Sequence, residues 1–130
     1  MIDLHAHILP GIDDGPKTLE DSLEMARLAV ADGITTMVAT PHLFRHKSVH
    51  LEDLNSPETI FRAVEDFSQE LTAAEVDLTI LPGCEIPLFG DIIKFIDTDQ
   101  VVTINRGQRY ICLELPDSII PPVLAQGQGL

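Results

Sequence analysis

The stretch "ITTMVATPH" occupies residues 34–42, and its first seven residues are all β-branched or apolar. A short run of this composition, without polar alternation, is typical of a strand buried on both faces of a parallel sheet. Pro41 has no N–H to donate to a ladder, so we expect the strand to end there. The segments on either side of this strand then decide the fold class.

Both flanking segments are predicted to be helical. Thr18 opens a capping-box-like start and Gly33 closes the first helix, whereas Ser56 and Pro57 are a favourable N-cap and first residue for the second. Apolar residues recur at helical spacing in each segment. The first stripe is Leu19, Leu23, Ala26 and Val30, and the second is Ile60, Val64, Phe67, Leu71 and Ala74.

The remaining apolar runs predict further strands. We expect them over residues 2–7, 78–86, 101–105 and 110–116, with a short helix over 90–97 and a hairpin turn or short connection at 106–109. Strands that alternate with helices form a parallel sheet with right-handed crossovers. The sequence therefore predicts an α/β fold with parallel strands.

Ligand-type side chains follow the predicted strands at their carboxyl ends. These are His5, His7, His42, Glu85 and Glu114. In parallel α/β folds these ends share one rim, where the chemistry gathers. We expect all five side chains to meet there.

The spacing of the first two histidines suggests a metal site. On a strand His5 and His7 would point the same way, with Asp3 one step below and able to orient one imidazole. Imidazole with carboxylate suits zinc, iron or manganese. The turn "GIDDG" adds Asp13 and Asp14, although both are also ordinary turn residues. The alternative is a set of polar strand-end residues that simply reach solvent.

A basic group stands out in the loop after residue 42. Arg45, His46, Lys47 and His50 are the local excess of basic side chains in a chain whose net charge is −13. Arg45 and Lys47 are candidates for steering a phosphate toward the rim. The alternative is an ordinary solvated loop.

Composition restricts the class of protein. The 130 residues are 45% hydrophobic with a mean hydropathy of +0.16, which indicates a folded domain. The negative charge argues against nucleic-acid or anionic-membrane partners. Cys84 and Cys112 form no C-x-x-C pair, so we expect two buried, reduced thiols. No signal peptide or apolar run of membrane-spanning length is present, so we expect a cytoplasmic protein.

Several of these motifs together resemble one family. Residues 3–42 carry D-x-H-x-H, the P-G-x-D-D-G turn and T-P-H, and G-x-E-I (83–86) and "RYICLELP" (109–116), then "IIPP", follow. This pattern resembles the polymerase-and-histidinol-phosphatase (PHP) superfamily, and within it the bacterial tyrosine phosphatases of capsule and exopolysaccharide synthesis.

The resemblance implies a distorted TIM-like barrel of seven β/α units, with parallel strands inside and helices outside. It implies up to three divalent metal ions, manganese foremost, with iron or zinc as alternatives. His5 and His7 would ligate one metal, Glu114 would bridge two, Glu85 would bind the second, and Asp14 and His42 would help hold the third. The implied reaction is hydrolysis of phosphotyrosine by metal-activated water, with a bacterial tyrosine kinase as the substrate protein.

The resemblance covers the N-terminal half of the family. Its later H-P-E-R segment and second D-x-H motif do not occur in these 130 residues, and Leu43 stands where many relatives have a histidine. We therefore expect residues 1–130 to be one truncated phosphatase domain with weakened metal binding and turnover. A homo-oligomer or a barrel-completing partner is expected to cover its open edges.

Three alternatives stay open at this point. The chain could be another PHP phosphoesterase, such as a histidinol phosphatase. It could be an amidohydrolase, which also begins with H-x-H on a barrel strand, although T-P-H and the lack of a carboxylated-lysine context argue against that. It could also be an inactive remnant that keeps some metal ligands.

Overall fold

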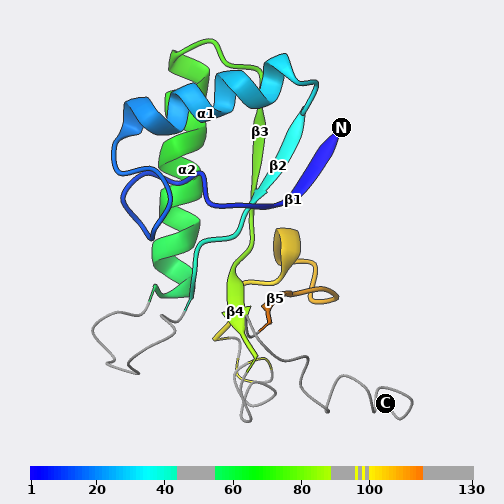
Figure 1. Ribbon diagram of the computed structural model, residues 1–130. Helices are drawn as coiled ribbons and strands as arrows, with labels where there is room; N and C mark the ends of the chain where they lie inside the picture. The colour runs from blue at the N-terminus through cyan, green and yellow to red at the C-terminus, as the bar shows by residue number, and fades with distance from the viewer. Residues whose placement is uncertain (44–54, 89–95, 97, 99, 116–130) are drawn as a thin grey trace.

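The structure is a computed structural model that describes residues 1–43, 55–88, 96, 98 and 100–115 (Figure 1). Two α-helices, five short strands and one 3-10 helix follow one another along these residues. They are β1 (Ile2–Ala6), α1 (Leu19–Ala31), β2 (Thr36–Ala39), α2 (Pro57–Ala73), β3 (Thr79–Pro82), β4 (Glu85–Pro87), η2 (Ile104–Arg106) and β5 (Cys112–Glu114).

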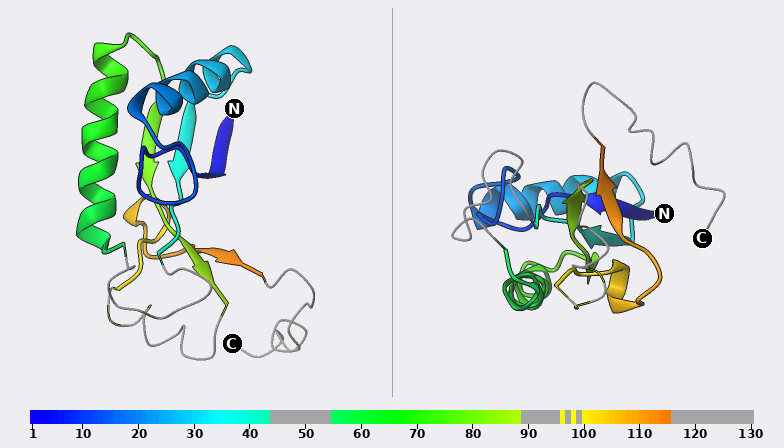
Figure 2. Two further views of the ribbon diagram at one scale, coloured as in Figure 1. Left: turned by 60° about the vertical axis from the view of Figure 1, so that its left-hand side comes forward. Right: turned by 90° about the horizontal axis from the view of Figure 1, so that it is seen from below.

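The strands form two small parallel sheets. The first has the order β1-β2-β3 and the second pairs β4 with β5. Figures 1 and 2 show α1 and α2 packed against the first sheet, with α2 running alongside β3. The prediction of an α/β fold with parallel strands is confirmed. The described residues form no closed barrel, so the seven-unit barrel stays a prediction.

Both helices begin where the sequence predicts. The hydroxyl of Thr18 accepts a hydrogen bond from the Asp21 amide (3.2 Å), and the hydroxyl of Ser56 accepts one from Thr59 (3.1 Å). Such caps satisfy backbone donors that have no partner within the helix. Of the helices that the structure describes, none is long and apolar enough to cross a membrane.

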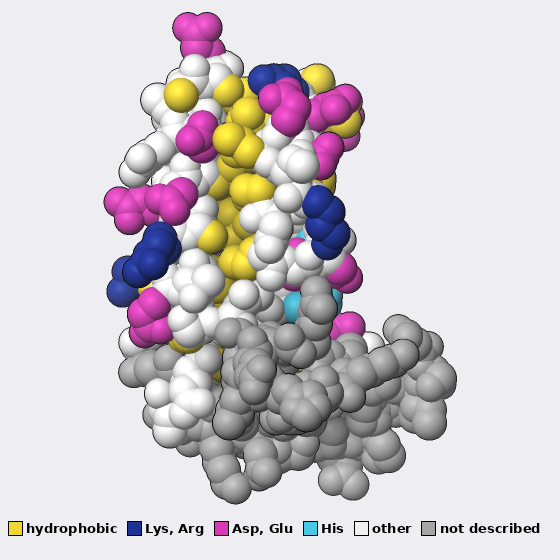
Figure 3. All heavy atoms as spheres, turned by 90° about the vertical axis from the view of Figure 1, so that its left-hand side faces the viewer, with side chains coloured by type: hydrophobic (Ala, Val, Ile, Leu, Met, Phe, Trp, Pro, Cys, Tyr) yellow, Lys and Arg dark blue, Asp and Glu magenta, His cyan; other side chains and the backbone are white. Residues whose placement is uncertain are grey.

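The apolar stripe of α2 supplies much of the core. Ile60, Val64, Phe67 and Leu71 are all buried, as predicted. The stripe of α1 is shorter than predicted, because only Leu23 and Ala26 are buried while Val30 is half-buried and Leu19 is exposed. Leu19 is the first residue of the helix, where the chain still lies at the surface. On the face in Figure 3, a strip of hydrophobic side chains runs between flanks of mainly acidic ones.

The predicted strand over 78–86 is wrong as a single element. It splits into β3 and β4, with Gly83 and Cys84 between them. The break coincides with a close approach of backbone to core, since a Cβ on Gly83 would lie 2.7 Å from Cγ1 of Val38. The chain leaves the first sheet at this point and starts the second.

The predicted strand over 101–105 is also wrong. Residues 104–106 form η2 instead, and Asn105 and Arg106 adopt positive φ values that a strand does not allow. The strand predicted over 110–116 is present as β5, over Cys112–Glu114. It runs parallel to β4, and residues 106–109 belong to the connection between these strands rather than to a hairpin turn. The helix predicted over 90–97 lies almost entirely outside the described residues.

The close approach at Gly83 yields a stability prediction. Gly83→Ala forces the new methyl group into Val38 and near the Ala39 carbonyl oxygen, 3.3 Å away. We expect a loss of about 1–3 kcal/mol in the free energy of unfolding, measured by urea denaturation. The control is Glu65→Ala on the exposed face of α2, which we expect to change stability by less than about 0.5 kcal/mol. Equal effects of the two substitutions would contradict the packing described for Gly83.

Candidate metal centre

The carboxylate of Glu85 lies at the centre of a group of three histidines. Its side chain is 8% exposed, and its Oε2 atom lies 3.0 Å from Nε2 of His7 and 3.2 Å from Nε2 of His5. The same oxygen lies 3.6 Å from Nδ1 of His42. A carboxylate is rarely this buried without a charged partner or a cation, so the arrangement indicates a candidate functional site.

The path of the chain after β2 explains this convergence. Beyond β2, His42 forms an isolated parallel bridge with Glu85 of β4. The Glu85 amide donates to the Pro41 carbonyl (3.0 Å), and the Leu43 amide donates to the Glu85 carbonyl (3.0 Å). These backbone bonds connect the two sheets and fix His42 beside Glu85.

The first strand is not the regular strand that the sequence predicts, because its pairing with β2 shifts before it reaches the site. Asp3 pairs with Met37 but Ala6 pairs with Ala39, so β1 holds one extra residue between these points. Such a bulge breaks the simple alternation of side chains. The Asp3 carboxylate accepts a hydrogen bond from the backbone amide of His5 (3.0 Å). Among the described residues, no imidazole nitrogen forms a hydrogen bond with this carboxylate. The prediction that Asp3 orients a histidine ring is wrong.

Asp13 takes the orienting role instead. Its Oδ2 atom lies 2.7 Å from Nδ1 of His7 and accepts the backbone amide of His42 (3.1 Å), while Oδ1 accepts the amide of Gly15 (2.9 Å). The turn is tight, because a Cβ on Gly15 would lie 2.6 Å from the His7 carbonyl oxygen. Asp13 therefore fixes the His7 ring, the turn and the start of the His42 segment together.

Two further predicted ligands lie at the edge of the same group. Oδ1 of the exposed Asp14 is 3.6 Å from Nδ1 of His7 and 3.5 Å from Nε2 of His42. Oε2 of Glu114 is 3.6 Å from Nδ1 of His42. The structure thus brings together all six residues predicted as ligands, although their roles as ligands stay a prediction. Figure 3 shows histidine side chains at the surface with acidic ones close by.

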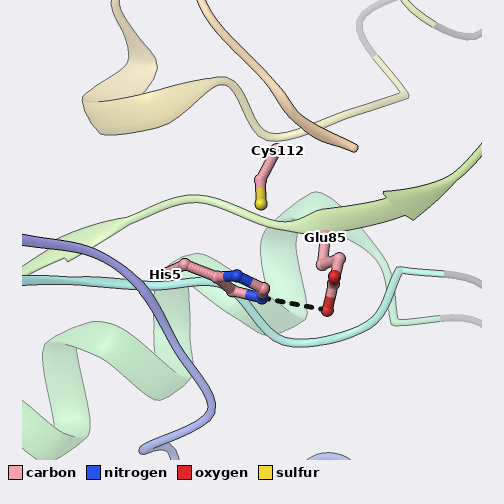
Figure 4. A group of neighbouring side chains, drawn as sticks. All are labelled: His5, Glu85 and Cys112. Carbon is pink, nitrogen blue, oxygen red and sulfur yellow. Dashed lines mark ion pairs between the residues drawn. The ribbon is translucent and has the colours of Figure 1, made fainter. Parts of the chain in front are cut away.

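Two other sequence-based predictions concern the basic loop after residue 42 and the cysteines. Arg45, His46, Lys47 and His50 lie outside the described residues, so phosphate steering by Arg45 and Lys47 stays a prediction. Cys112 was expected to be a buried, reduced thiol, but it is only half-buried, and its thiol points toward the side on which His5 and Glu85 lie (Figure 4). The signal for it was the spacing of Cys112 and Glu114, which places both on one face of β5.

The described donor atoms form three overlapping groups that fit divalent cations. They are His7, His42 and Glu85; His7, Asp13 and Asp14; and His5, Glu85 and Cys112, with the donor atoms of each group within 4.8 Å of one another. Imidazole, carboxylate and thiolate donors are those that zinc, iron and manganese use in proteins. The group of His7, His42 and Glu85 shares His7 with the second group and Glu85 with the third. Cations bound to the three groups would therefore be neighbours.

Charges around His7 shift its protonation. The hydrogen bond that His7 donates to the Asp13 carboxylate raises the pKa of His7 above its ordinary value of 6.5. Burial lowers this pKa, but the nearby charges of Asp13, Glu85 and Asp14 add to the increase. Burial works against the charged form of Asp13, yet hydrogen bonds from His7, Gly15 and His42 bring the pKa of Asp13 below 3.8. In the metal-free chain, the two residues therefore form an ion pair at pH values between these two pKa values.

This ion pair predicts a pH dependence. The His7 contribution to stability is full below pH 6.5 and is lost as the pH rises through its raised pKa; the Asp13 contribution is full above pH 3.8 and is lost as the pH falls through its lowered pKa. With a chelator present, we expect the melting temperature to fall as the pH rises above about 6.5, and His7→Gln to flatten this decline. A cation needs the neutral ring, so its affinity should rise over the same pH range. If the melting temperature of the His7→Gln variant falls as steeply with pH as that of the wild type, with a chelator present in both, the His7–Asp13 ion pair is contradicted.

Comparison with known proteins places the chain among capsule-synthesis proteins. A family model described as "Capsular polysaccharide synthesis, CpsB/CapC" matches residues 1–119. The tyrosine-protein phosphatase YwqE of Bacillus subtilis (strain 168) is 37% identical over 121 residues, which are 93% of this chain and 45% of YwqE. The putative tyrosine-protein phosphatase CapC of Staphylococcus aureus is 31% identical with the same coverage of both chains.

Solved structures agree with the sequence comparison. A chain from the crystal structures of YwqE from Bacillus subtilis and CpsB from Streptococcus pneumoniae, which are described as unique metal-dependent tyrosine phosphatases, matches with a TM-score of 0.86 and 36% identity. The match covers 97% of this chain and 49% of that chain. The chain spans about half the length of the curated relatives it matches. On the family model and the shared fold, the chain belongs to the CpsB/CapC family of capsular polysaccharide synthesis proteins.

Proposed function

We propose that this chain contributes to a metal-dependent phosphatase that hydrolyses phosphotyrosine on proteins during capsular polysaccharide synthesis. The observation that carries the proposal is the buried carboxylate of Glu85, which lies within 3.6 Å of ring nitrogens from three histidines. The relatives named as tyrosine phosphatases supply the reaction and favour phosphotyrosine over histidinol phosphate.

The resemblance to the tyrosine phosphatases suggests how the cations are shared. We assign His5 and His7 to one cation, Glu85 to a second, and Asp14 and His42 to a third. Glu114 would bridge two of them, since its carboxylate lies beside His42. Bound divalent cations lower the pKa of water at the site and screen the charge of the phosphoryl group. Manganese, iron and zinc all suit these donors.

Residues behind the ligands hold them in position. Asp13 keeps Nδ1 of His7 engaged, so that Nε2 is the nitrogen that points toward Glu85. The side-chain amide of Asn55 donates to the His42 carbonyl (2.8 Å) and so ties the end of the His42 segment to the start of α2. Partners of this kind orient ligands and strengthen metal binding.

Substrate and partners follow from the relatives. We propose a phosphotyrosine protein as substrate, with a bacterial tyrosine kinase as the specific case, and Arg45 and Lys47 as the groups that steer its phosphate. A cytoplasmic location, the absence of a nucleic-acid partner, and a homo-oligomer or barrel-completing partner stay predictions from the sequence. Manganese as the physiological metal is also part of the proposal.

Activity of the purified chain tests this function. With Mn²⁺ we expect phosphate release from a phosphotyrosine peptide in preference to histidinol phosphate, abolished by chelation. His42→Ala should lower the rate by at least about tenfold, because it removes a donor beside Glu85. The control is Arg27→Ala on α1, whose partner Glu20 lies at the surface. Preference for histidinol phosphate would favour the other phosphoesterase, and bound metal without turnover would indicate an inactive remnant.

A further inference from the structure

Cys112 occupies a position that neither the sequence-based prediction nor the reaction proposed above uses. In the parallel pair of β4 and β5, Cys112 lies directly beside Glu85, and Glu114 lies beside Pro87. Paired residues of neighbouring strands point to the same side of a sheet, so the thiol and the Glu85 carboxylate share one face. In Figure 4 the thiol points from β5 toward the side on which Glu85 and His5 lie.

Three donors of different chemistry converge at this point. Nε2 of His5 lies 3.2 Å from Oε2 of Glu85, and a donor atom from each of His5, Glu85 and Cys112 lies within 4.8 Å of the others. Around a tetrahedral zinc ion, donors at about 2.0–2.3 Å from the metal lie ~3.5 Å apart. Small rotations of these side chains would therefore bring all three onto one cation. Half of the His5 side chain is exposed, so an ion has access from solvent.

We propose that Cys112 is a metal ligand in this chain, holding one divalent cation together with His5 and Glu85. The proposal rests on the metal centre proposed above. It adds a sulfur donor to the cation assigned to His5, and it has Glu85 bind this cation as well as the second one. On binding, the thiol gives its proton to the solvent and the sulfur bonds to the cation. Because thiolate is a soft ligand, this donor favours zinc over manganese at the position beside His5.

The second cysteine provides a matched control. Cys84 precedes Glu85 but is fully buried, and its sulfur lies 3.3 Å from both the backbone nitrogen and the carbonyl oxygen of Val102. Burial raises the pKa of Cys84 to about 12, and it also raises the pKa of Cys112. Unlike Cys112, Cys84 belongs to none of the candidate metal groups among the described residues.

Cobalt(II) is a suitable spectroscopic probe, because visible d–d bands report that the ion is bound and a near-ultraviolet charge-transfer band reports a thiolate ligand. We expect wild type and Cys84→Ser to show both bands when metal-free chain is titrated with Co²⁺. Cys112→Ser should keep the visible bands and lose the near-ultraviolet one. Visible bands without a charge-transfer band in the wild type, or a band that survives in Cys112→Ser, would overturn the assignment while leaving the metal centre intact. No cobalt bands in the wild type would contradict both.

A second measurement uses the wild-type chain and needs no variant to fold. Zn²⁺ should protect Cys112 from alkylation, as read by peptide mass spectrometry, whereas Cys84 stays unmodified until the chain is denatured. A third measurement uses the variant: Zn²⁺ affinity should fall by at least about tenfold in Cys112→Ser, with a smaller change for Mn²⁺. Alkylation of Cys112 at the same rate with saturating Zn²⁺, or equal losses for the two metals, would overturn the proposal.

Discussion

Glu85→Gln should lower divalent-cation affinity by at least about 100-fold. Removing an outer hydrogen-bond partner of a metal ligand already costs about 10–100-fold, and Glu85 is proposed as a ligand itself. The substitution keeps the size of the side chain but removes the charge that three imidazoles face. Each of two candidate donor groups contains Glu85, so both lose their anionic oxygen together. Isothermal titration with Mn²⁺ and Zn²⁺ measures the change.

A surface glutamate supplies the comparison for this experiment. Glu70→Gln lies on the exposed side of α2 and alters the net charge by the same amount. We expect its cation affinity to match the wild type, which separates the loss of a ligand from a general change in charge. An unaltered affinity in Glu85→Gln would remove Glu85 from the site.

Asp13→Ala is expected to be the substitution that most destabilises the metal-free chain. Its carboxylate serves three donors, on His7, Gly15 and His42, in a residue that is 5% exposed. Alanine leaves these groups without their partner, and we expect a loss of roughly 2–4 kcal/mol in the free energy of unfolding. Urea denaturation with a chelator present gives the value.

The neighbouring residue is the natural control for Asp13. Asp14 has a side chain that is 72% exposed and contacts His7 and His42 only at 3.6 and 3.5 Å. Asp14→Ala should change stability by less than about 0.5 kcal/mol while still weakening cation binding. Similar destabilisation by both substitutions would show that Asp13 does not hold the turn.

The helices and the first strands were predictable because their signals are local. Caps at Thr18 and Ser56 and the apolar stripe of α2 depend on residues within a few turns of one another. The structure bears out these parts of the fold. It also brings His42 to Glu85 as expected, but at the first residue of β4 and not at the carboxyl end of a strand.

The errors arise where distant contacts decide the local structure. The split at Gly83 lies where the backbone comes close to Val38, and the extra residue in β1 becomes visible only once β1 is paired with β2. Periodicity within one segment cannot reveal either feature. For the same reason Asp3 looked like the orienting carboxylate, whereas Asp13 reaches His7 through a turn whose shape depends on Gly15.

The location of bound metal tests the central claim most directly. Crystals of the chain grown with Mn²⁺ or Zn²⁺ allow anomalous diffraction at the absorption edge of the metal. The account predicts anomalous peaks about 2.0–2.3 Å from a carboxylate oxygen of Glu85 and about 2.0–2.3 Å from an imidazole nitrogen of His7. Anomalous peaks only at other places in the chain, with the Glu85 carboxylate bound to histidines alone, would contradict it.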